Sequence, residues 1–417
     1  MSGNVPKGWR EVRIGQIARE ISNRNRTSAD IPVLSMTKHR GFVRSNEYFS
    51  KSVYSENTDR YKIVKRGQFA YATIHLDEGS IDYLKNEDAG LISPMYTVFE
   101  TDCEEIDPEI ALRKFKRFAL SGRFDPYSNG GVNRRKSILF RDLSAFKFAL
   151  PPLAEQYAIA EIFSTVEEAI ATSEAVCVQL HEMTEALAEA LFLGIDPCTG
   201  HKKVDGWRTS TLASEMASIQ VGIVVKPASY YVEVGGVPAL RSLNVRPNRL
   251  YLGELVKISE HGHRLNRKSA LRVGDVVTVR TGEPGKTAVV PHNIGEINCI
   301  DVIFSRPGSE VRGEYVSFFM NSRIAKRQIA VLQGGLAQQH LNVGEMKRIQ
   351  IRVPPLARQD QIVGLLKGAW SRIEAEEATL KKLISLRASL SQELLSGRIR
   401  LPESIIARHR NKAGRAA

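Results

Sequence analysis

The residues of this chain that are best suited to chemistry are hydrogen-bond donors and cations gathered in short polar stretches. In the first part of the chain they are Lys38, His39, Arg40, Arg44, Tyr71 close to His75, Asn133, Arg134, Arg135 and Lys136. In the later part they are Arg241, Asn244, Arg246, Asn248, Arg249, Arg280, Gln338, Gln339 and His340. Arginine, lysine and amide side chains donate hydrogen bonds to base edges and to phosphates. Both groups therefore predict DNA-binding surfaces.

Three stretches imitate catalytic motifs without completing them. RTGEPGKT (280–287) ends like a phosphate-binding loop, but Arg280 stands where that motif needs its first glycine, and no helix signal follows. A turn between two strands is the better interpretation. DPYS (125–128) has one proline where amino-methyltransferases have two, and no glycine-rich loop for S-adenosylmethionine follows any expected strand. HGH (261–263) predicts a turn rather than a metal pair on one helix face. We expect no catalytic set, cofactor site or metal site in this chain.

The composition is ordinary for a water-soluble protein and leans toward a polyanionic partner. The 417 residues are 42% hydrophobic and 25% charged, with a formal net charge of +13. No apolar run is long enough for a membrane span, and the first residues lack the apolar core of a secretory signal. The four cysteines show no C-x-x-C spacing, which fits a reducing cytoplasm.

The chain repeats itself. PPLAEQ (151–156) returns as PPLARQ (354–359), and the Gly-Trp pair at 8–9 returns at 206–207. Gly130-Gly131 and Gly334-Gly335 lie about twenty residues before the two proline pairs. The stretches between these anchors differ entirely, and the polar cluster after the glycine pair is arginine-rich in the first copy and amide-rich in the second. One framework is therefore used twice with different contents, as two readers of different DNA sequences would require.

Each proline pair opens a long helix pattern. Apolar residues recur at helical 3/4 spacing from Ile159 and again from Ile362, for roughly 38 residues or about 57 Å in each copy. Helices this long need a partner, and a pseudo-two-fold relation between the copies would pair them antiparallel. That pairing would put Ser173 near Arg387 and Thr184 near Glu376. The alternative is two separate helices, each packed on its own domain.

These signals divide the chain into an α+β protein of two similar globules separated by two long antiparallel coiled-coil helices. The expected segments are a first globule at 1–150, a first helix at 151–194, a second globule at 195–353, a second helix at 354–397 and a basic, frayed tail at 398–417. Short β-rich runs fill both globules, and each ends with one helical stretch, at 108–124 and at 313–332.

Charge separates the roles of these segments. The first helix carries eight Glu and no Lys or Arg, whereas both globules are basic. DNA phosphates would repel such a helix, so the globules must hold the DNA. The acidic helix suits a protein partner, or is simply a solvated acidic face.

The anchors together resemble the specificity subunit of type I restriction-modification systems. The resemblance covers nearly the whole chain and is carried by the two PPLA-x-Q stretches, the two Gly-Trp pairs and LLSGRIR (394–400). The chain departs from the family habit at Arg358, where the first copy has Glu155, a difference that bears on a local partner contact. The chain also lacks a clear glycine after the first helix, apart from Gly194.

The resemblance implies that each globule is a target-recognition domain that reads one half of a split, asymmetric DNA site. It implies that the helices act as a ruler between the half-sites and dock methylation subunits, of which we expect two. Those partners would bind S-adenosylmethionine and methylate adenine, and restriction subunits would use ATP and Mg to translocate and cleave DNA. This chain would itself carry no catalysis.

Two other functions remain open on the residues alone. A stand-alone DNA methyltransferase or nuclease would need the cofactor loop and catalytic tetrapeptide that the motifs above fail to complete. A structural coiled-coil adaptor without DNA specificity would need no basic globules.

Overall fold

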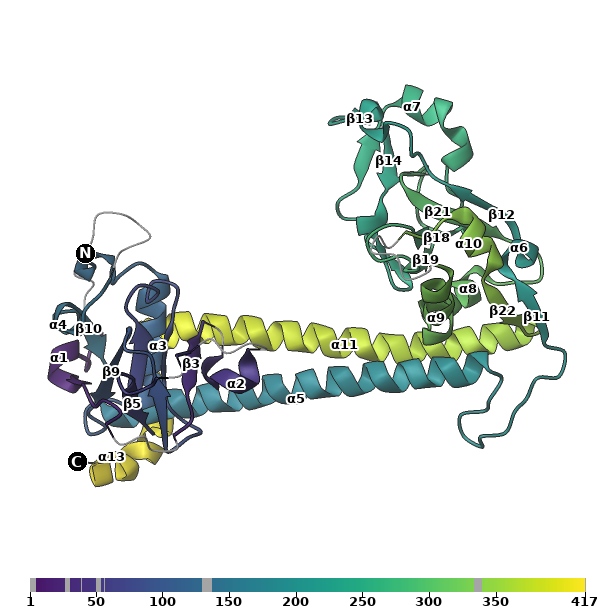
Figure 1. Ribbon diagram of the computed structural model, residues 1–417. Coiled ribbons are helices and arrows are strands. Elements are labelled where there is room, and N and C mark those ends of the chain that lie inside the picture. Colours follow the sequence, from purple (N-terminus) through teal and green to yellow (C-terminus); the bar gives the residue numbers. More distant parts are fainter. Residues whose placement is uncertain are drawn as a thin grey trace. The chain divides into compact units, whose positions relative to one another are not determined.

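The computed structural model describes residues 5–26, 31–38, 40–49, 54–55, 57–129, 137–333 and 340–416. It consists of two compact units, Met1–Thr172 with Leu380–Ala417, and Ser173–Thr379. Each unit combines one globule with part of each of two long helices, α5 (Leu153–Phe192) and α11 (Leu356–Leu394), which are labelled in Figure 1. The predicted α+β class and the two long helices are thus confirmed.

The first globule is built on a four-stranded antiparallel sheet in the order β2-β9-β6-β7. Its strands are β2 (Ala18–Ile21), β9 (Tyr96–Thr101), β6 (Phe69–Ala72) and β7 (Ile81–Tyr83). Helix α3 (Pro108–Leu120) begins at Asp107, whose side chain accepts from the backbone N–H groups of the first turn. Phe115 of α3 packs against Phe69 and Phe99 of the sheet, and this aromatic cluster is the core.

The second globule repeats this sheet in the order β12-β21-β18-β19, again antiparallel. Its strands are β12 (Met216–Val221), β21 (Val302–Pro307), β18 (Val276–Val279) and β19 (Thr287–Val289). Tyr315 and Phe319 of helix α8 (Gly313–Asn321) share a core with Val276 and Ile303 of the sheet. The duplication predicted from sequence anchors is therefore a duplication of strand order.

The late helical stretch of the second globule differs from the prediction of one continuous helix. It consists of α8 and α9 (Arg323–Leu332), separated at Ser322, whose extended backbone lets its side chain cap the N-terminus of α9. The Asn321 side chain also donates to Thr287 O, Asn248 Oδ1 and Ser317 O, and its Oδ1 accepts from Thr287 N. Ser and Asn compete for backbone hydrogen bonds in this way, so the helix breaks between them.

Smaller elements complete both units. In the first unit they are β1 (Arg10–Arg13), β3 (Leu34–Thr37), β4 (Gly41–Arg44), β5 (Lys62–Lys65), β8 (Ala89–Ile92), β10 (Lys147–Leu150), α1 (Ile14–Ile17), α2 (Ser45–Tyr48), α4 (Phe140–Leu143), α12 (Glu403–Ile406) and α13 (Arg410–Ala416). In the second they are β11 (Arg208–Thr211), β13 (Tyr231–Val232), β14 (Val237–Leu240), β15 (Val245–Arg246), β16 (Arg249–Leu250), β17 (Val256–Ile258), β20 (Asn298–Cys299), β22 (Gln350–Val353), α6 (Leu212–Glu215), α7 (Glu260–Leu265) and α10 (Val343–Arg348). The β1–β10 pair recurs as β11–β22, each directly before a proline pair.

The glutamine of the first PPLA-x-Q stretch fastens α5 to the first globule. Gln156 is fully buried, and its Oε1 accepts from Asp107 N at 2.9 Å. Its Nε2 donates to Glu105 O at 3.0 Å and to Pro151 O at 2.9 Å. One amide therefore satisfies three backbone groups at the junction, where a buried unpaired group would be costly.

The second copy repeats this junction. Gln359 is also fully buried, accepts from Arg312 N at 2.8 Å, and donates to Glu310 O at 2.9 Å and Pro354 O at 2.8 Å. Two copies of the motif thus make the same set of bonds. The repeated sequence is explained by a repeated structural joint.

The helices α5 and α11 run antiparallel, as predicted. In the first unit, Ile159 and Phe163 share a core with Leu394 and Leu395. In the second unit, Leu191 and Phe192 share a core with Ile362 and Leu366. Low numbers of one helix therefore meet high numbers of the other in both units.

The predicted register was wrong. Ser173 lies opposite Glu376, to which its Oγ donates at 2.5 Å, and not near Arg387. Arg387 follows Glu376 by about three turns, roughly 16 Å along the helix axis. The prediction paired the first polar break of each seam with the second break of the other, whereas Ser173 faces its own equivalent position, Glu376. By the same shift, Thr184 lies away from Glu376.

The tail is not frayed. Arg400 Nε and Nη2 donate to the two carboxylate oxygens of Glu155, both at 2.7 Å. His409 Nε2 lies 2.8 Å from Glu161 Oε2, and Lys412 Nζ lies 4.3 Å from the centre of the Tyr157 ring. The prediction failed because the basic tail meets the acidic start of α5 within the same unit.

Most of the carboxylates of α5 have basic partners within the chain. Besides Glu155 and Glu161, Glu167 pairs with Arg113 at 2.8 Å. Glu185 pairs with Arg323 at 2.5 Å, and Glu189 pairs with Arg327 at 2.9 Å. Five of the eight carboxylates are thus in intramolecular pairs, so the acidic helix chiefly serves contacts with its own globules.

Among the helices that the structure describes, none is both long and apolar enough to cross a membrane.

Candidate nucleic-acid interface

Two loops of the first globule bring predicted DNA-binding residues together. Lys38, in the turn between β3 and β4, lies 3.7 Å from Glu78 Oε2, and His75 Nδ1 lies 3.3 Å from Glu78 Oε1. Arg40, in the same turn, has its guanidinium 5.7 Å from the centre of the Tyr48 ring. All three predicted side chains (Lys38, Arg40 and His75) are exposed. This cluster supplies basic side chains at the surface, with the Glu78 carboxylate beside two of them.

Arg44 lies at the end of β4 and is engaged by acids. Its Nε donates to Glu87 at 2.7 Å and its Nη1 to Glu47 at 3.3 Å. These bonds raise the pKa of Arg44 and lower that of Glu87. The remaining predicted residues of this globule, His39, Asn133, Arg134, Arg135 and Lys136, lie outside the described residues.

Tyr71 has to be removed from the DNA-binding set. Its side chain is fully buried in the core, and its hydroxyl donates to Ile138 O at 3.0 Å. Burial raises the pKa of the Tyr71 phenol well above its usual value. An aromatic residue on the inward face of a strand packs in the core, and the alternation along β6 was not resolved by the sequence pattern. Tyr71 instead anchors the segment that begins at Ile138.

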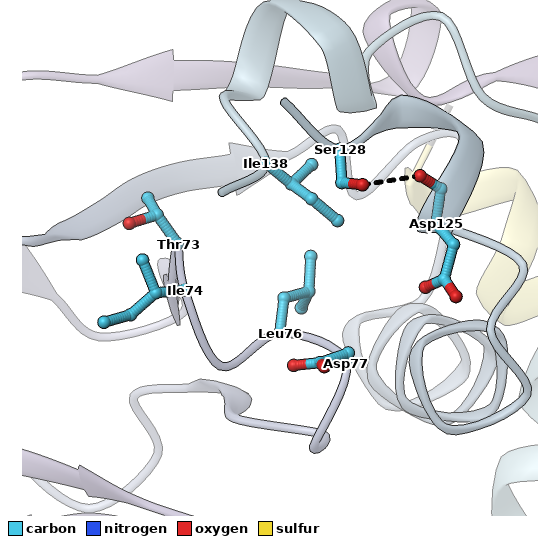
Figure 2. Close-up of a pocket in the computed structure, with 7 residues that line it drawn as sticks. All are labelled: Thr73, Ile74, Leu76, Asp77, Asp125, Ser128 and Ile138. Atoms are coloured by element: carbon cyan, nitrogen blue, oxygen red, sulfur yellow. Dashed lines mark hydrogen bonds between the residues drawn. The ribbon is translucent and has the colours of Figure 1, made fainter. Parts of the chain in front are cut away.

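A pocket of about 300 Å³ opens at the end of β6 (Figure 2). Its lining residues are Thr73, Ile74, Leu76, Asp77, Asp125, Ser128 and Ile138. Figure 2 shows Ile138 and Ser128 entering from one side and Leu76 and Asp77 from the opposite side. Ser128 Oγ donates to Asp125 O at 2.7 Å, which shapes the DPYS stretch as a short 3₁₀ turn. Carboxylates and hydroxyls beside apolar groups can accept from base amino groups and contact a thymine methyl.

In the second globule the structure brings Arg280 and His340 together. Arg280 follows β18, and its Nη1 donates to Asp301 Oδ1 at 3.0 Å. Its Nη2 donates to His340 Nε2 at 2.6 Å, across 60 positions of sequence. The other ring nitrogen of His340 lies 3.0 Å from Thr281 Oγ1. Asp301 and Thr281 were missed from the sequence, because nothing in their neighbourhood marks them as partners of Arg280.

The Arg280 site and the pocket of the first globule occupy the same place in the repeated framework. Leu341 N donates to Arg280 O at 2.7 Å, and Ile138 N donates to Thr73 O at 3.0 Å. Strands β18 and β6 occupy equivalent places in the two sheets. Each bond joins the residue after one of these strands to the segment that follows the glycine pair. Arg280 therefore stands where the first globule has Thr73.

The Arg241 to Arg246 stretch has mixed roles. Asn244 is buried, its Oδ1 accepts from Arg241 N at 2.9 Å, and its Nδ2 donates to Tyr251 O and Glu254 O. It holds a turn and has to be removed from the DNA-binding set, because it is only 2% exposed. Arg246 is exposed, and Arg241 is half-buried with its Nε lacking a partner. Ser242 Oγ donates to Asp301 O at 3.4 Å, so this stretch lies beside the Arg280 site.

The neighbouring residues Asn248 and Arg249 face other parts of the second unit. Asn248 Oδ1 accepts from Asn321 Nδ2 at 2.8 Å, and Arg249 Nη1 lies 3.0 Å from Glu374 of α11. These contacts are structural. Gln338 and Gln339 lie outside the described residues.

The stretches 280–287 and 261–263, which imitate catalytic motifs, are ordinary structural elements. Residues 280–287 form the connection between β18 and the antiparallel β19, as the turn interpretation predicted. HGH is part of the short helix α7, not a turn, because Ser259 caps its first turn. His263 is buried there against Glu296 and Asn298. Within the described ranges, no group of three or more His, Cys, Asp or Glu could hold a metal ion.

Comparisons with known proteins agree with this arrangement. A family model described as the type I restriction modification DNA specificity domain matches residues 6–181. The type I restriction enzyme MjaVIII specificity subunit of Methanocaldococcus jannaschii is 23% identical over 423 residues, which cover 95% of this chain and 94% of that protein.

Two solved structures share the fold. A chain from the work described as "Structural basis underlying complex assembly and conformational transition of the type I R-M system" has a TM-score of 0.60 at 18% identity, with 95% of this chain and 100% of that chain covered. The S subunit of the type I restriction-modification system of M. genitalium has a TM-score of 0.53 at 14% identity, with 94% and 97% covered. Over nearly its whole length the chain is thus similar to type I restriction-modification specificity subunits.

Proposed function

We propose that this chain is the DNA-sequence specificity subunit of a type I restriction-modification complex and reads a bipartite site, one half with each globule. The observation that carries the proposal is a sheet framework used twice with different side chains at the same strand end, Thr73 in one and Arg280 in the other. A conserved scaffold with exchanged contact residues is what two readers of different half-sites require.

The two long helices act as the ruler between the half-sites. α5 has 40 residues and α11 has 39, so each is about 60 Å long. At roughly 3.4 Å per base pair this limits the gap to about 17 base pairs, and the globules shorten it further because they overlap the helix ends. The glutamine joints support this role, because they fix each helix rigidly to its globule.

The chain acts within an assembly and carries no catalysis of its own. Methylation subunits, two of them, dock on the helices, bind S-adenosylmethionine and methylate adenine. Restriction subunits supply ATP- and Mg-dependent translocation and cleavage. The proposal implies a cytoplasmic location in a prokaryote, where these subunits meet the chromosome.

The experiment is coexpression of this chain with a cognate methylation subunit, followed by mapping of methylated motifs. We expect one bipartite motif with an unspecified gap. Exchange of residues 1–150 for the corresponding segment of another specificity subunit should change one half of the motif only. A contiguous motif, or a change in both halves, would contradict the proposal.

Two control measurements separate the alternatives. The purified chain alone should transfer no methyl groups, and clear activity would favour a stand-alone methyltransferase. Binding should fall steeply with salt and favour one site, since an adaptor without DNA specificity would bind weakly and without sequence preference.

A further inference from the structure

We propose that Arg280 reads a guanine in the half-site bound by the second globule, and that Asp301 and His340 are positioning residues for its guanidinium. The inference rests on the proposed function and assigns a base to one of its two surfaces. It is carried by the geometry of one small cluster at the end of β18.

The guanidinium of Arg280 is oriented from two sides. Asp301 accepts from Nη1 at 3.0 Å, and His340 accepts at Nε2 from Nη2 at 2.6 Å. Arginine has five N–H donors and no acceptor, so these bonds leave three donors unused. The backbone of Arg280 is also fixed, because its carbonyl accepts from Leu341 N.

This arrangement determines the state of His340. Because arginine can only donate, Nε2 of His340 must present its lone pair to Arg280. The proton then resides on Nδ1, which donates to Thr281 Oγ1 at 3.0 Å. Arg280 therefore donates to both Asp301 and His340, and His340 donates in turn to Thr281.

The unused donors match one base. Arg280 Nε is buried without a partner, yet the side chain as a whole remains 18% exposed, so the exposure lies elsewhere on the side chain. Guanine presents O6 and N7 as adjacent acceptors in the major groove, which suits the guanidinium fork. Adenine places a donor beside N7, and cytosine presents a donor, so both oppose it.

The ion pair argues against a phosphate contact. Asp301 carries a carboxylate 3.0 Å from the guanidinium, and a negative charge at this distance weakens attraction to a phosphate. It does not weaken the directional donation that base recognition needs. Asp301 also has a left-handed backbone, with φ of 49°, at which few non-glycine residues are found. The site thus keeps a strained residue where it orients Arg280.

The first globule has different side chains at the positions that correspond to Arg280 and His340. Its equivalent strand end carries Thr73, whose hydroxyl donates to Met95 O at 3.3 Å, and the residue that corresponds to His340 is Ser137. No guanidinium fork exists at these two described positions. The two half-sites should therefore differ at the base pair that this strand end faces.

The test uses the full chain coexpressed with its methylation subunit and a library of duplexes with randomised half-sites. Bound duplexes are sequenced for the wild type, Arg280→Thr, Arg280→Lys and Asp301→Asn. Asparagine tolerates the left-handed backbone, so Asp301→Asn removes the charge without forcing the loop to change. The matched control is Arg348→Gln, an exposed arginine on α10 in the same unit.

We expect Arg280→Thr to reduce the preference for guanine at one position of the second half-site by about 10–100-fold, with the first half-site unchanged. Arg280→Lys should also lose preference there, because a point charge cannot bridge both acceptors. Asp301→Asn should weaken preference at the same position, and Arg348→Gln should change nothing.

Two outcomes would overturn the inference. One is a uniform loss of affinity for all sequences with a shallower salt dependence, which marks a phosphate contact. The other is an unchanged base preference in the folded variants, judged by melting temperature, with Arg280→Lys deciding if Arg280→Thr is unstable. If the wild type shows no bipartite preference at all, the proposed function itself fails, which is a distinct result.

Discussion

Ser173 Oγ donates to Glu376 Oε1 at 2.5 Å, and these two residues are 203 positions apart, the same separation as the two PPLA-x-Q joints. Equivalent positions of the two copies therefore touch each other. Ser173 lies at the middle of α5 (Leu153–Phe192), and Glu376 lies at the middle of α11 (Leu356–Leu394). The contact marks the centre of the α5–α11 seam.

The polar Ser173–Glu376 pair should specify the register of the two helices at some cost in stability. Ser173 is buried, so Ser173→Ala leaves the Glu376 carboxylate without its donor and should lower stability by about 1–3 kcal/mol. The double variant Ser173→Ala with Glu376→Leu restores an apolar seam and should melt at or above the wild type. Thermal melts of the wild type, Ser173→Ala and the double variant test this prediction. A double variant less stable than Ser173→Ala would contradict it.

The glutamine joint should be a local lock. Gln156→Ala leaves Asp107 N, Glu105 O and Pro151 O without their partner and should destabilise the first unit by about 2–4 kcal/mol. Hydrogen exchange should accelerate at the Asp107 amide. Gln392→Ala, at an exposed position of α11 in the same unit, is the control and should leave that amide unchanged. Protection of the Asp107 amide in Gln156→Ala equal to that in the wild type would contradict the role of Gln156 in the joint.

The docked tail should be needed for the stability of the first unit. The Glu155 side chain is 2% exposed, accepts from Trp9 Nε1 at 3.1 Å, and depends on Arg400 for its charge partner. Arg400→Ala should therefore cost about 3–5 kcal/mol, because it leaves a buried carboxylate unpaired. Adding Glu155→Gln should recover part of the loss. Melting curves followed by tryptophan fluorescence test both, and no recovery in the double variant would point to lost packing instead.

Lys114 should make stability depend on pH. Burial, with a smaller effect of Arg117 and Arg123, lowers the pKa of Lys114 to about 7, although its Nζ donates to Ala149 O and Leu395 O. Between pH 7 and the usual lysine pKa the unfolded chain then binds more protons than the folded one, so this group makes stability rise with pH, by at most about 1.4 kcal/mol per unit.

The measurement for this effect is chemical denaturation at pH 7 and pH 9. Lys114→Met should remove the rise, and Lys147→Met, at a side chain that is 51% exposed, should retain it. A wild type that follows Lys114→Met at both pH values would contradict the lowered pKa.

Much of the architecture was predictable because the repeat is written in short-range signals. Proline pairs, helical spacing and β-rich runs depend on local geometry, and they predicted the two helices, the two globules and the connection at 280–287 correctly. The exchange of Thr73 for Arg280 on an equivalent strand end was visible only once the sheet order was known.

The errors lie where distant parts of the chain meet. The register shows in the contact of Ser173 with Glu376, 203 positions away, and the tail folds because Arg400 meets Glu155, a residue 245 positions away. Tyr71 and Asn244 have side chains that suit DNA, but burial gives them other partners. No periodicity records such contacts, so residue type alone selected these two wrongly.

We propose that the two DNA-reading globules are held apart by the paired helices α5 and α11, and the length of the gap between the half-sites tests this. Residues 170–176 of α5 and 373–379 of α11, one heptad from each helix centred on Ser173 and on Glu376, are deleted together so that the seam keeps its phase. The methylated motif of the shortened complex is then mapped. Each helix loses about 10 Å, so the gap should shorten by about three base pairs while both half-sites keep their sequences. An unchanged gap with both half-sites intact would contradict the account.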